Sequence, residues 1–402
     1  MRVFVTGIGC VSGIGMEVKE HLRSFQSGQD GLGGVTLFPT RHDLPVSEVK
    51  EGNTALRERL ALSASRTFSR TALLGMLAAK EAFDDAAIDP VSRLRTGLVS
   101  STSTGGMDLT EQFYPLFREH PAHGRLRHVV SHDAGDSTER IASYLGMTGF
   151  RTTVSTACSS AANAILFAVR LIKQGILDVV LAGGTDALCR FTLNGFASLM
   201  ILDKAPCRPF DDTRAGLNLG EGAGYLVLQS EASLTKPPYC ELGGYANVND
   251  AYHQTASSPD GAGAYRAMKD CLGRAGLPPH EVDYINAHGT GTLNNDASES
   301  AAIRHLFGDA VPPFSSTKAF TGHTLGAAGG LEAVFSVLSV SGGLLFPNKN
   351  FTTPIPATGL IPVTRYAAGE PIRTVLSNSF GFGGNNTSLL FCKTDTQQIY
   401  EN

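Results

Sequence analysis

The sequence predicts an α/β fold in which helices pack on buried strands, and two observations lead to this class. Short apolar runs alternate with longer helical patterns along all 402 residues. Glycine is abundant, with 45 residues, and supplies the tight turns that such alternation requires. The chain is also too long for one small domain and can bury a large core.

Apolar runs rich in Val, Ile and Leu are interpreted as the strands. In chain order they cover residues 3–9, 96–102, 178–186, 224–230, 283–290, 311–317, 374–380 and 387–393. Three stretches between them, 159–174, 265–275 and 331–340, have the apolar spacing of buried helices. The alternation of the two patterns therefore extends over both halves of the chain.

A segment with two prolines, SLTKPPYC at 233–240, separates halves of about 235 and 165 residues. Each half contains strands, a glycine-rich turn and an Ala-rich helix, which indicates an internal duplication of one α/β unit. We therefore expect one domain at 1–235 and a second at 236–402.

The composition excludes several classes of protein. A net charge of −4 argues against a nucleic-acid binder, which needs a strongly basic face. The seven cysteines are scattered without a CxxC pair, so we expect neither a disulfide framework nor a metal site. Residues 1–9 resemble a buried strand rather than a signal peptide, and Gly, Ser and His interrupt the apolar run at 322–345. We expect a cytoplasmic protein without a membrane span.

Cys158 is the candidate nucleophile. It lies between a predicted strand and the helix at 159–174, among small residues that let a substrate approach. A helix N-terminus lowers a thiol pKa and offers free N–H groups, so this position favours a reactive thiolate beside an oxyanion site. A buried structural cysteine is the alternative interpretation, and we adopt it for the remaining cysteines.

Two histidines lie in similar glycine-flanked turns. His288 belongs to NAHGTGT at 286–292, and His323 to STKAFTGHTLGAAGGLE at 316–332. One histidine alone is more often a hydrogen-bonded structural residue. Two of them, together with a cysteine in a similar turn, indicate a catalytic site.

The order of these motifs resembles the elongating β-ketoacyl-acyl carrier protein synthases of the synthase I/II type, in the thiolase superfamily. The matching motifs are VTGIGCVSGIG, TACSSA, RPFDDTRAG, GEGAG, NAHGTGT, STKAFTGHTLGAAGGLE and SNSFGFGGNN. The resemblance implies a thiolase-like fold, with duplicated α/β halves and two central mixed sheets in a layered α-β-α-β-α arrangement. GEGAG also looks like a nucleotide-binding motif, but it opens a strand instead of joining a strand to a helix.

The reaction implied by the resemblance is a decarboxylating Claisen condensation. An acyl thioester on Cys158 would react with malonyl-acyl carrier protein to give β-ketoacyl-acyl carrier protein and carbon dioxide. The backbone N–H groups of Cys158 and Phe382 would form the oxyanion hole, and Phe382 would also be the gate for the acyl chain. His288 and His323 would donate hydrogen bonds to the malonyl thioester oxygen and stabilise the enolate.

Further roles are implied for neighbouring residues. Lys318 and Glu332 would form a charged pair that supports the region of His323. Thr290 and Thr292 would hydrogen-bond the pantetheine arm. No cofactor of its own is implied, since the carrier protein delivers the phosphopantetheine.

The resemblance places Thr104 near the bottom of the acyl pocket. Phe196 lies in the stretch 185–200, which differs from the housekeeping enzymes, and is a second candidate for contacting the acyl chain. A small polar residue at 104 makes a polyene or polyketide pathway an alternative to fatty-acid elongation. Besides a homodimeric enzyme, the sequence is compatible with a catalytic subunit paired with a chain-length-factor-like partner, and with a non-catalytic acyl-binding relative.

Acyl carrier proteins are acidic, so the residues that dock them should be basic. Arg66 and Arg70 are four residues apart and share one face if 60–80 is helical. Arg125, Arg127 and Arg208 complete the candidate set. The alternative interpretation is an ordinary solvated arginine.

Overall fold

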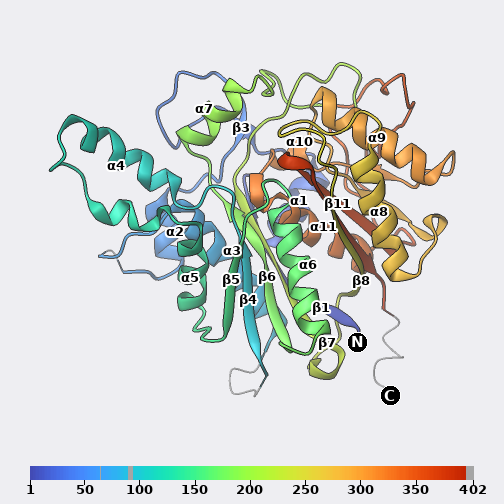
Figure 1. Cartoon of the computed structure of the whole chain (residues 1–402), viewed down its shortest axis with the longest axis horizontal. Coiled ribbons are helices and arrows are strands. Elements are labelled where there is room, and N and C mark those ends of the chain that lie inside the picture. The colour runs from blue at the N-terminus through green and yellow to red at the C-terminus, as the bar shows by residue number, and fades with distance from the viewer. Residues whose placement is uncertain (64, 89–93, 395–402) are drawn as a thin grey trace.

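The computed structural model describes residues 1–63, 65–88 and 94–394. The main strands are β1 (Val3–Ser12), β4 (Thr96–Ser101), β5 (Phe150–Val154), β6 (Val179–Asp186), β7 (Gly222–Ser230), β8 (Cys240–Asn249), β9 (Tyr284–Asn286), β10 (Phe314–Ser315), β11 (Thr374–Gly381) and β12 (Asn385–Cys392). They form one ten-stranded sheet in the order β10-β9-β11-β12-β8-β1-β7-β6-β4-β5 (Figure 1). A separate ribbon pairs β2 (Leu32–Gly33) with β3 (Val46–Ser47).

The two halves of the sheet have the same pairing pattern. β7 is antiparallel to β1 and β6, while β4 is parallel to β6 and β5. In the second half β12 is antiparallel to β8 and β11, while β9 is parallel to β11 and β10. The two expected sheets are joined at one edge, because Phe4 pairs with Glu241 and Val5 with Cys240. The domain boundary at residue 235 stays a prediction.

Helices cover both faces of the sheet and the space between its halves. They are α1 (Val18–Ser27), α2 (Asn53–Arg59), α3 (Arg70–Ala86), α4 (Met107–Glu119), α5 (Ala134–Tyr144), α6 (Ser160–Lys173), α7 (Arg190–Ser198), α8 (Ala262–Ala275), α9 (Leu293–Phe307), α10 (Lys318–Thr321) and α11 (Ala328–Gly342). In Figure 1, α4 and α5 lie at one side of the molecule and α8 and α9 at the other.

The cores show the expected five layers. The largest core cluster joins α6 and α11 to strands of both halves, including Leu226 of β7 and Val375 of β11. A second cluster packs α3 on the outer face of the first half, and a third packs α8 and α9 on the outer face of the second. The thiolase-like, layered α/β arrangement is therefore confirmed.

The central position of α11 explains two sequence features. Residues Leu325–Gly342 are long and apolar enough to cross a membrane, but 83% of this span is buried inside the protein, as in a core helix. Gly224 of the GEGAG motif faces α11 so closely that a Cβ there would lie 2.3 Å from Leu331 N. The missing side chain at this position lets β7 pack closely on α11. The glycine motif therefore serves packing and does not form a nucleotide-binding loop.

Two strands are shorter than the sequence predicted. β9 ends at Asn286, and the following residues turn into the loop that carries His288. β10 contains only Phe314–Ser315, because Pro312 and Pro313 have no N–H to donate to a neighbouring strand. The loop after β9 carries His288 and Thr290, which line the cavity described next.

Candidate active site

A strained turn places Cys158 at the beginning of α6. The preceding residue, Ala157, has φ of 52°, a left-handed conformation that residues with a Cβ rarely adopt. A bridge between Thr156 and Cys158 closes this turn, and α6 begins at Ser160. The thiol is 6% exposed, so it lies at the end of a cavity rather than on the surface.

The electrostatics of this thiol differ from the expectation. Burial raises the pKa of Cys158 to about 11, although the N–H of Phe382, the charge of Lys318 and its own N–H oppose that shift. The predicted lowering of the thiol pKa is therefore wrong for this structure, because desolvation outweighs the nearby N–H groups. The N–H groups of Cys158 and Phe382 nevertheless approach the sulfur, where an oxyanion would form.

The turn after α10 fixes His323. Its N–H donates to Asn218 O at 2.7 Å and its carbonyl accepts from Gly220 N at 2.9 Å, which ties the backbone to the first half of the chain. Its Nδ1 accepts the N–H of Leu325 at 3.0 Å, so the ring proton must lie on Nε2. Leu325 can make this bond because its φ is 54°. Burial, followed by the charge of Lys318, lowers the pKa of His323 to about 3 and keeps the ring neutral.

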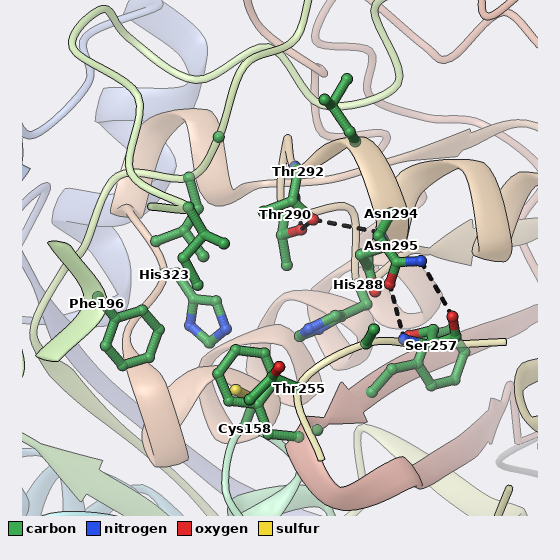
Figure 2. A pocket seen from close by; sticks show the side chains of 18 of the residues that line it. Cys158, Phe196, Thr255, Ser257, His288, Thr290, Thr292, Asn294, Asn295 and His323 are labelled. Carbon is green, nitrogen blue, oxygen red and sulfur yellow. Dashed lines mark hydrogen bonds between the residues drawn. The ribbon is translucent and has the colours of Figure 1, made fainter. Parts of the chain in front are cut away.

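His288 is held in a similar state by different groups. The ammonium of Lys318 donates to His288 O at 2.5 Å and lies 3.2 Å from its Nδ1. Lysine has no acceptor, so Nδ1 accepts and the ring proton again lies on Nε2. Burial, then Lys318 and His323, lower the pKa of His288 well below its usual value. The two neutral rings are perpendicular, with centroids 5.5 Å apart (Figure 2).

The Lys318–Glu332 pair is present and almost completely buried, with side chains 2% and 3% exposed. Its side-chain hydrogen bonds reach His288. The charge of Lys318 also acts on His323, and the Lys318 carbonyl accepts from Gly322 N at 2.9 Å, so the pair contacts both histidine regions. The side-chain ammonium lies at His288 because Nδ1 of His323 is already occupied by the N–H of Leu325.

Glu299 and Leu325 contribute to the site but were not predicted as site residues. Both oxygens of Glu299 accept backbone N–H groups, from His288 at 3.0 Å and Gly289 at 2.8 Å, and so hold the histidine turn. Glu299 could have been predicted from its position, because it is a carboxylate in the helix that follows a glycine-rich turn. The left-handed backbone of Leu325 had no signal in the sequence.

Cys158, His288 and His323 surround one cavity of about 220 Å³, which we call the histidine cavity (Figure 2). The predicted pantetheine contacts also line it, since Thr290 and Thr292 lie on its wall. Their hydroxyl oxygens are 2.9 Å apart. The three reactive side chains that were predicted from distant motifs are therefore brought together.

A second, more apolar cavity of about 340 Å³ adjoins the same thiol, and we call it the apolar cavity. Thr104 lines it, as expected for an acyl pocket, together with Leu325. Phe196 and Phe382 line both cavities, and their rings are stacked with centroids 6.0 Å apart. The two rings lie where a gate between the cavities would have to move.

The arginines predicted to dock a carrier protein are not equivalent. Arg66, Arg125 and Arg127 are exposed, and Arg208 is half-buried and paired with Asp203 at 3.2 Å. The prediction for Arg70 is wrong, because its guanidinium is buried and binds both oxygens of Glu221 at 2.8 and 2.7 Å. The helix begins at Arg70 instead of spanning 60–80, so the two residues do not share a helical face.

Comparisons with known proteins agree with this geometry. Models of the β-ketoacyl synthase N-terminal and C-terminal domains match residues 1–233 and 239–352. The 3-oxoacyl-[acyl-carrier-protein] synthase 2 of Staphylococcus aureus strain MRSA252 is 34% identical over 410 residues, covering 98% of each chain.

Two solved structures are similar over nearly the whole chain. The ishigamide ketosynthase/chain length factor gives a TM-score of 0.92 at 31% identity, covering 98% of this chain and 99% of that one. The ketosynthase ApeO, in complex with its chain length factor ApeC from Xenorhabdus doucetiae, gives 0.86 at 33% identity and 98% coverage of both.

Proposed function

This chain belongs to the β-ketoacyl synthase family, and we propose that Cys158, His288 and His323 carry out its decarboxylating condensation. The enzyme is an acyltransferase that elongates a carrier-bound acyl chain. One observation carries the assignment of roles. Both imidazoles have Nδ1 occupied by a donor, which leaves two Nε2–H groups in the cavity that contains the thiol.

In the first half-reaction, the sulfur of Cys158 adds to the thioester carbonyl of an acyl-carrier protein. The oxyanion that forms is stabilised by the N–H groups of Cys158 and Phe382. The tetrahedral intermediate then expels the pantetheine sulfur, which takes up the proton lost by the thiol. The acyl chain remains on Cys158 and extends past Phe382 into the apolar cavity.

In the second half-reaction, malonyl-carrier protein occupies the histidine cavity. Its thioester oxygen accepts hydrogen bonds from Nε2 of His288 and His323. When the carbon–carboxylate bond breaks, carbon dioxide leaves and the electron pair becomes an enolate that these donors stabilise. The enolate carbon attacks the acyl carbonyl and expels Cys158 as a thiolate. The thiolate takes up one proton from solvent to restore the thiol, which completes a ping-pong cycle.

Neutral rings suit this chemistry better than charged ones. A neutral imidazole already carries the Nε2–H group that donates a hydrogen bond to the enolate, so its protonation state need not change. Burial keeps both rings neutral at physiological pH. The side chain of Lys318 is paired with Glu332 and lies 3.2 Å from Nδ1 of His288, so its charge polarises this ring. We propose no cofactor beyond the phosphopantetheine of the carrier.

We propose that a second ketosynthase-fold subunit covers the wall of the apolar cavity. Phe191 and Leu199 of this wall are 56% and 42% exposed. Leu126 and Val130, in two short turns that contact α4 as α7 does, are 76% and 64% exposed. Such a group of exposed apolar side chains usually marks an interface. The subunit is a second copy or, as in the ishigamide and ApeO structures, a chain length factor.

The carrier protein is proposed to dock through the exposed arginines Arg66, Arg125 and Arg127. We also propose a cytoplasmic location, supported by the seven cysteines, all of which are free thiols. The pathway is proposed to be fatty-acid or polyene and polyketide elongation.

The test begins with an acyl-carrier protein and intact-mass measurement of the chain. We expect one acyl adduct that disappears in Cys158→Ala. Malonyl-carrier protein should then release carbon dioxide and give a product longer by two carbons. Absence of the adduct from the folded enzyme, with and without a chain-length-factor partner, would support the non-catalytic acyl-binding alternative. Size exclusion of the chain alone separates a homodimer from a subunit that needs that partner.

A further inference from the structure

Asp186 ends β6 as a completely buried carboxylate with neutral hydrogen-bond partners. One group of donors comes from residues 102–104, namely Thr102 Oγ1 at 2.5 Å, Ser103 N at 2.9 Å, Ser103 Oγ at 2.6 Å, Thr104 N at 3.2 Å and Thr104 Oγ1 at 3.0 Å. The other donor is Gly326 N at 2.7 Å. The carboxylate therefore connects two segments that are more than 200 residues apart in the chain.

Each of these segments has a position in the site. Ser103 and Thr104 line the apolar cavity. The hydroxyl of Thr104 donates to Asp186, so this side chain uses its polar group inside the protein. The presence of a polar residue at 104 therefore does not indicate that the end of the acyl pocket is polar.

Gly326 directly follows Leu325, whose N–H fixes the proton of His323 on Nε2. The side chain of Leu325 also lines the apolar cavity. The contact with Asp186 is tight, since a Cβ on Gly326 would lie 2.7 Å from Asp186 Oδ2 and 2.9 Å from Ser103 N. A small displacement of Gly326 would therefore move the N–H on which the orientation of His323 depends.

We propose that Asp186 is a positioning residue that orients His323 and ties it to the wall of the apolar cavity. This inference rests on the proposed function. The physical reason is that hydrogen bonds to an ionised acceptor are short and strong, so one carboxylate can hold both segments rigidly. When the acyl chain contacts Thr104 or Leu325, the carboxylate of Asp186 keeps the Nε2–H group of His323 directed at the malonyl thioester oxygen.

An amide cannot keep all the hydrogen bonds of the carboxylate. Asparagine has a single acceptor oxygen, and its NH₂ group would face N–H or O–H donors at the other position. In Asp186→Asn, an NH₂ group at the Oδ2 position would face the N–H groups of Gly326 and Ser103. At the Oδ1 position it would face that of Thr104, so a backbone N–H of at least one segment loses its acceptor. Asp186 does not contact the substrate, so the loss should affect the step that uses His323 more than the acylation of Cys158.

The test measures the two half-reactions separately in the full-length chain, with its partner subunit if one is required. For Asp186→Asn we expect kcat for carbon dioxide release from malonyl-carrier protein to fall about 10- to 100-fold, as a misplaced catalytic group does. The KM should change by less than about twofold, and the Cys158 acylation rate, by mass spectrometry, by less than about threefold.

Asp211→Asn is the matched control. Asp211 is also completely buried and accepts hydrogen bonds from Thr213, Thr352 and Thr353, but it has no bond to either histidine segment. Its substitution should lower stability and leave the ratio of the two half-reaction rates unchanged. If Asp186→Asn fails to fold, Thr102→Val removes one buried donor to Asp186 at a residue that does not line the apolar cavity, and it should lower carbon dioxide release about threefold in the same selective way.

An equal loss of both half-reactions in folded Asp186→Asn, or no loss, would overturn the inference. The same holds if Asp211→Asn shows the same selectivity. Failure of the proposed function looks different, because the unmodified enzyme would then form no adduct on Cys158 and release no carbon dioxide.

Discussion

Lys318→Met is the substitution that tests the construction of the site most directly. It removes an ammonium that binds Glu332, His288 O and His288 Nδ1, while the methionine fills a similar volume. Both side chains of the ion pair are at most 3% exposed, so solvent screens them little. Breaking a buried pair by removing one partner costs about 3–5 kcal/mol, and we expect that loss in the free energy of unfolding.

The same substitution should impair decarboxylation. Without the ammonium at Nδ1, His288 can place its proton on either nitrogen, and the carbonyl that positions the turn loses a donor. Removal of one donor to a developing oxyanion typically costs ~10²–10³ in rate. We expect kcat for carbon dioxide release to fall about 10²-fold, within that range, while acylation of Cys158 is affected less.

The double variant Lys318→Met with Glu332→Gln separates these two effects. Removing both charges leaves no unpaired ion, and replacing a buried pair by neutral groups is often close to neutral for stability. Urea denaturation should therefore show recovery of most of the lost stability, whereas carbon dioxide release should remain low. Wild-type decarboxylation in either folded variant would refute the role assigned to Lys318, and recovery of both properties would show that its effect is only structural.

Two further predictions concern the thiol and the arginines. Because burial raises the pKa of Cys158 to about 11, its alkylation by iodoacetamide should accelerate about tenfold per pH unit from pH 7 to 9.5, and a plateau below pH 8 would contradict this. Arg70→Met should destabilise the fold by about 3–5 kcal/mol, since it leaves Glu221 buried without its partner. Arg66→Ala should instead raise the KM for the carrier protein and change the unfolding free energy by less than about 0.5 kcal/mol, and the reverse pattern would restore Arg70 as a docking residue.

The fold and the main site were predictable because they depend on local patterns. The spacing of apolar residues and the local composition identified the strands and the helix that follows Cys158. The observed α6 differs from the predicted helix by one residue at each end. The glycine-flanked turns identified His288 and His323, because a side chain that must reach a cavity needs a backbone that turns at a strand end. The resemblance then assigned the chemistry.

Features that depend on contacts between distant segments have no local pattern. The partner of Arg70 is Glu221, 151 positions away, so its charge could not be distinguished from that of a surface arginine. The hydrogen bonds of Lys318 to His288 had no signal in the sequence for the same reason. The resemblance implied only the region of His323, whereas the tertiary fold also presents His288, since Leu325 already occupies Nδ1 of His323.

The error about the Cys158 pKa shows how burial organises the whole site. Desolvation disfavours the charged form of every group, so it raises the pKa of the thiol and lowers the pKa of both imidazoles. A reactive thiolate–imidazolium pair, as in enzymes whose histidine activates a cysteine, is therefore disfavoured here. Two neutral imidazole donors and a neutral thiol remain. Such a site is suited to stabilising the negative charge that develops on a bound thioester during the reaction, and not to holding a thiolate before the substrate binds. The thiol must then lose its proton as the acyl group arrives, so acylation depends on the pKa of Cys158, whereas the decarboxylation step, in which the sulfur is acylated, does not.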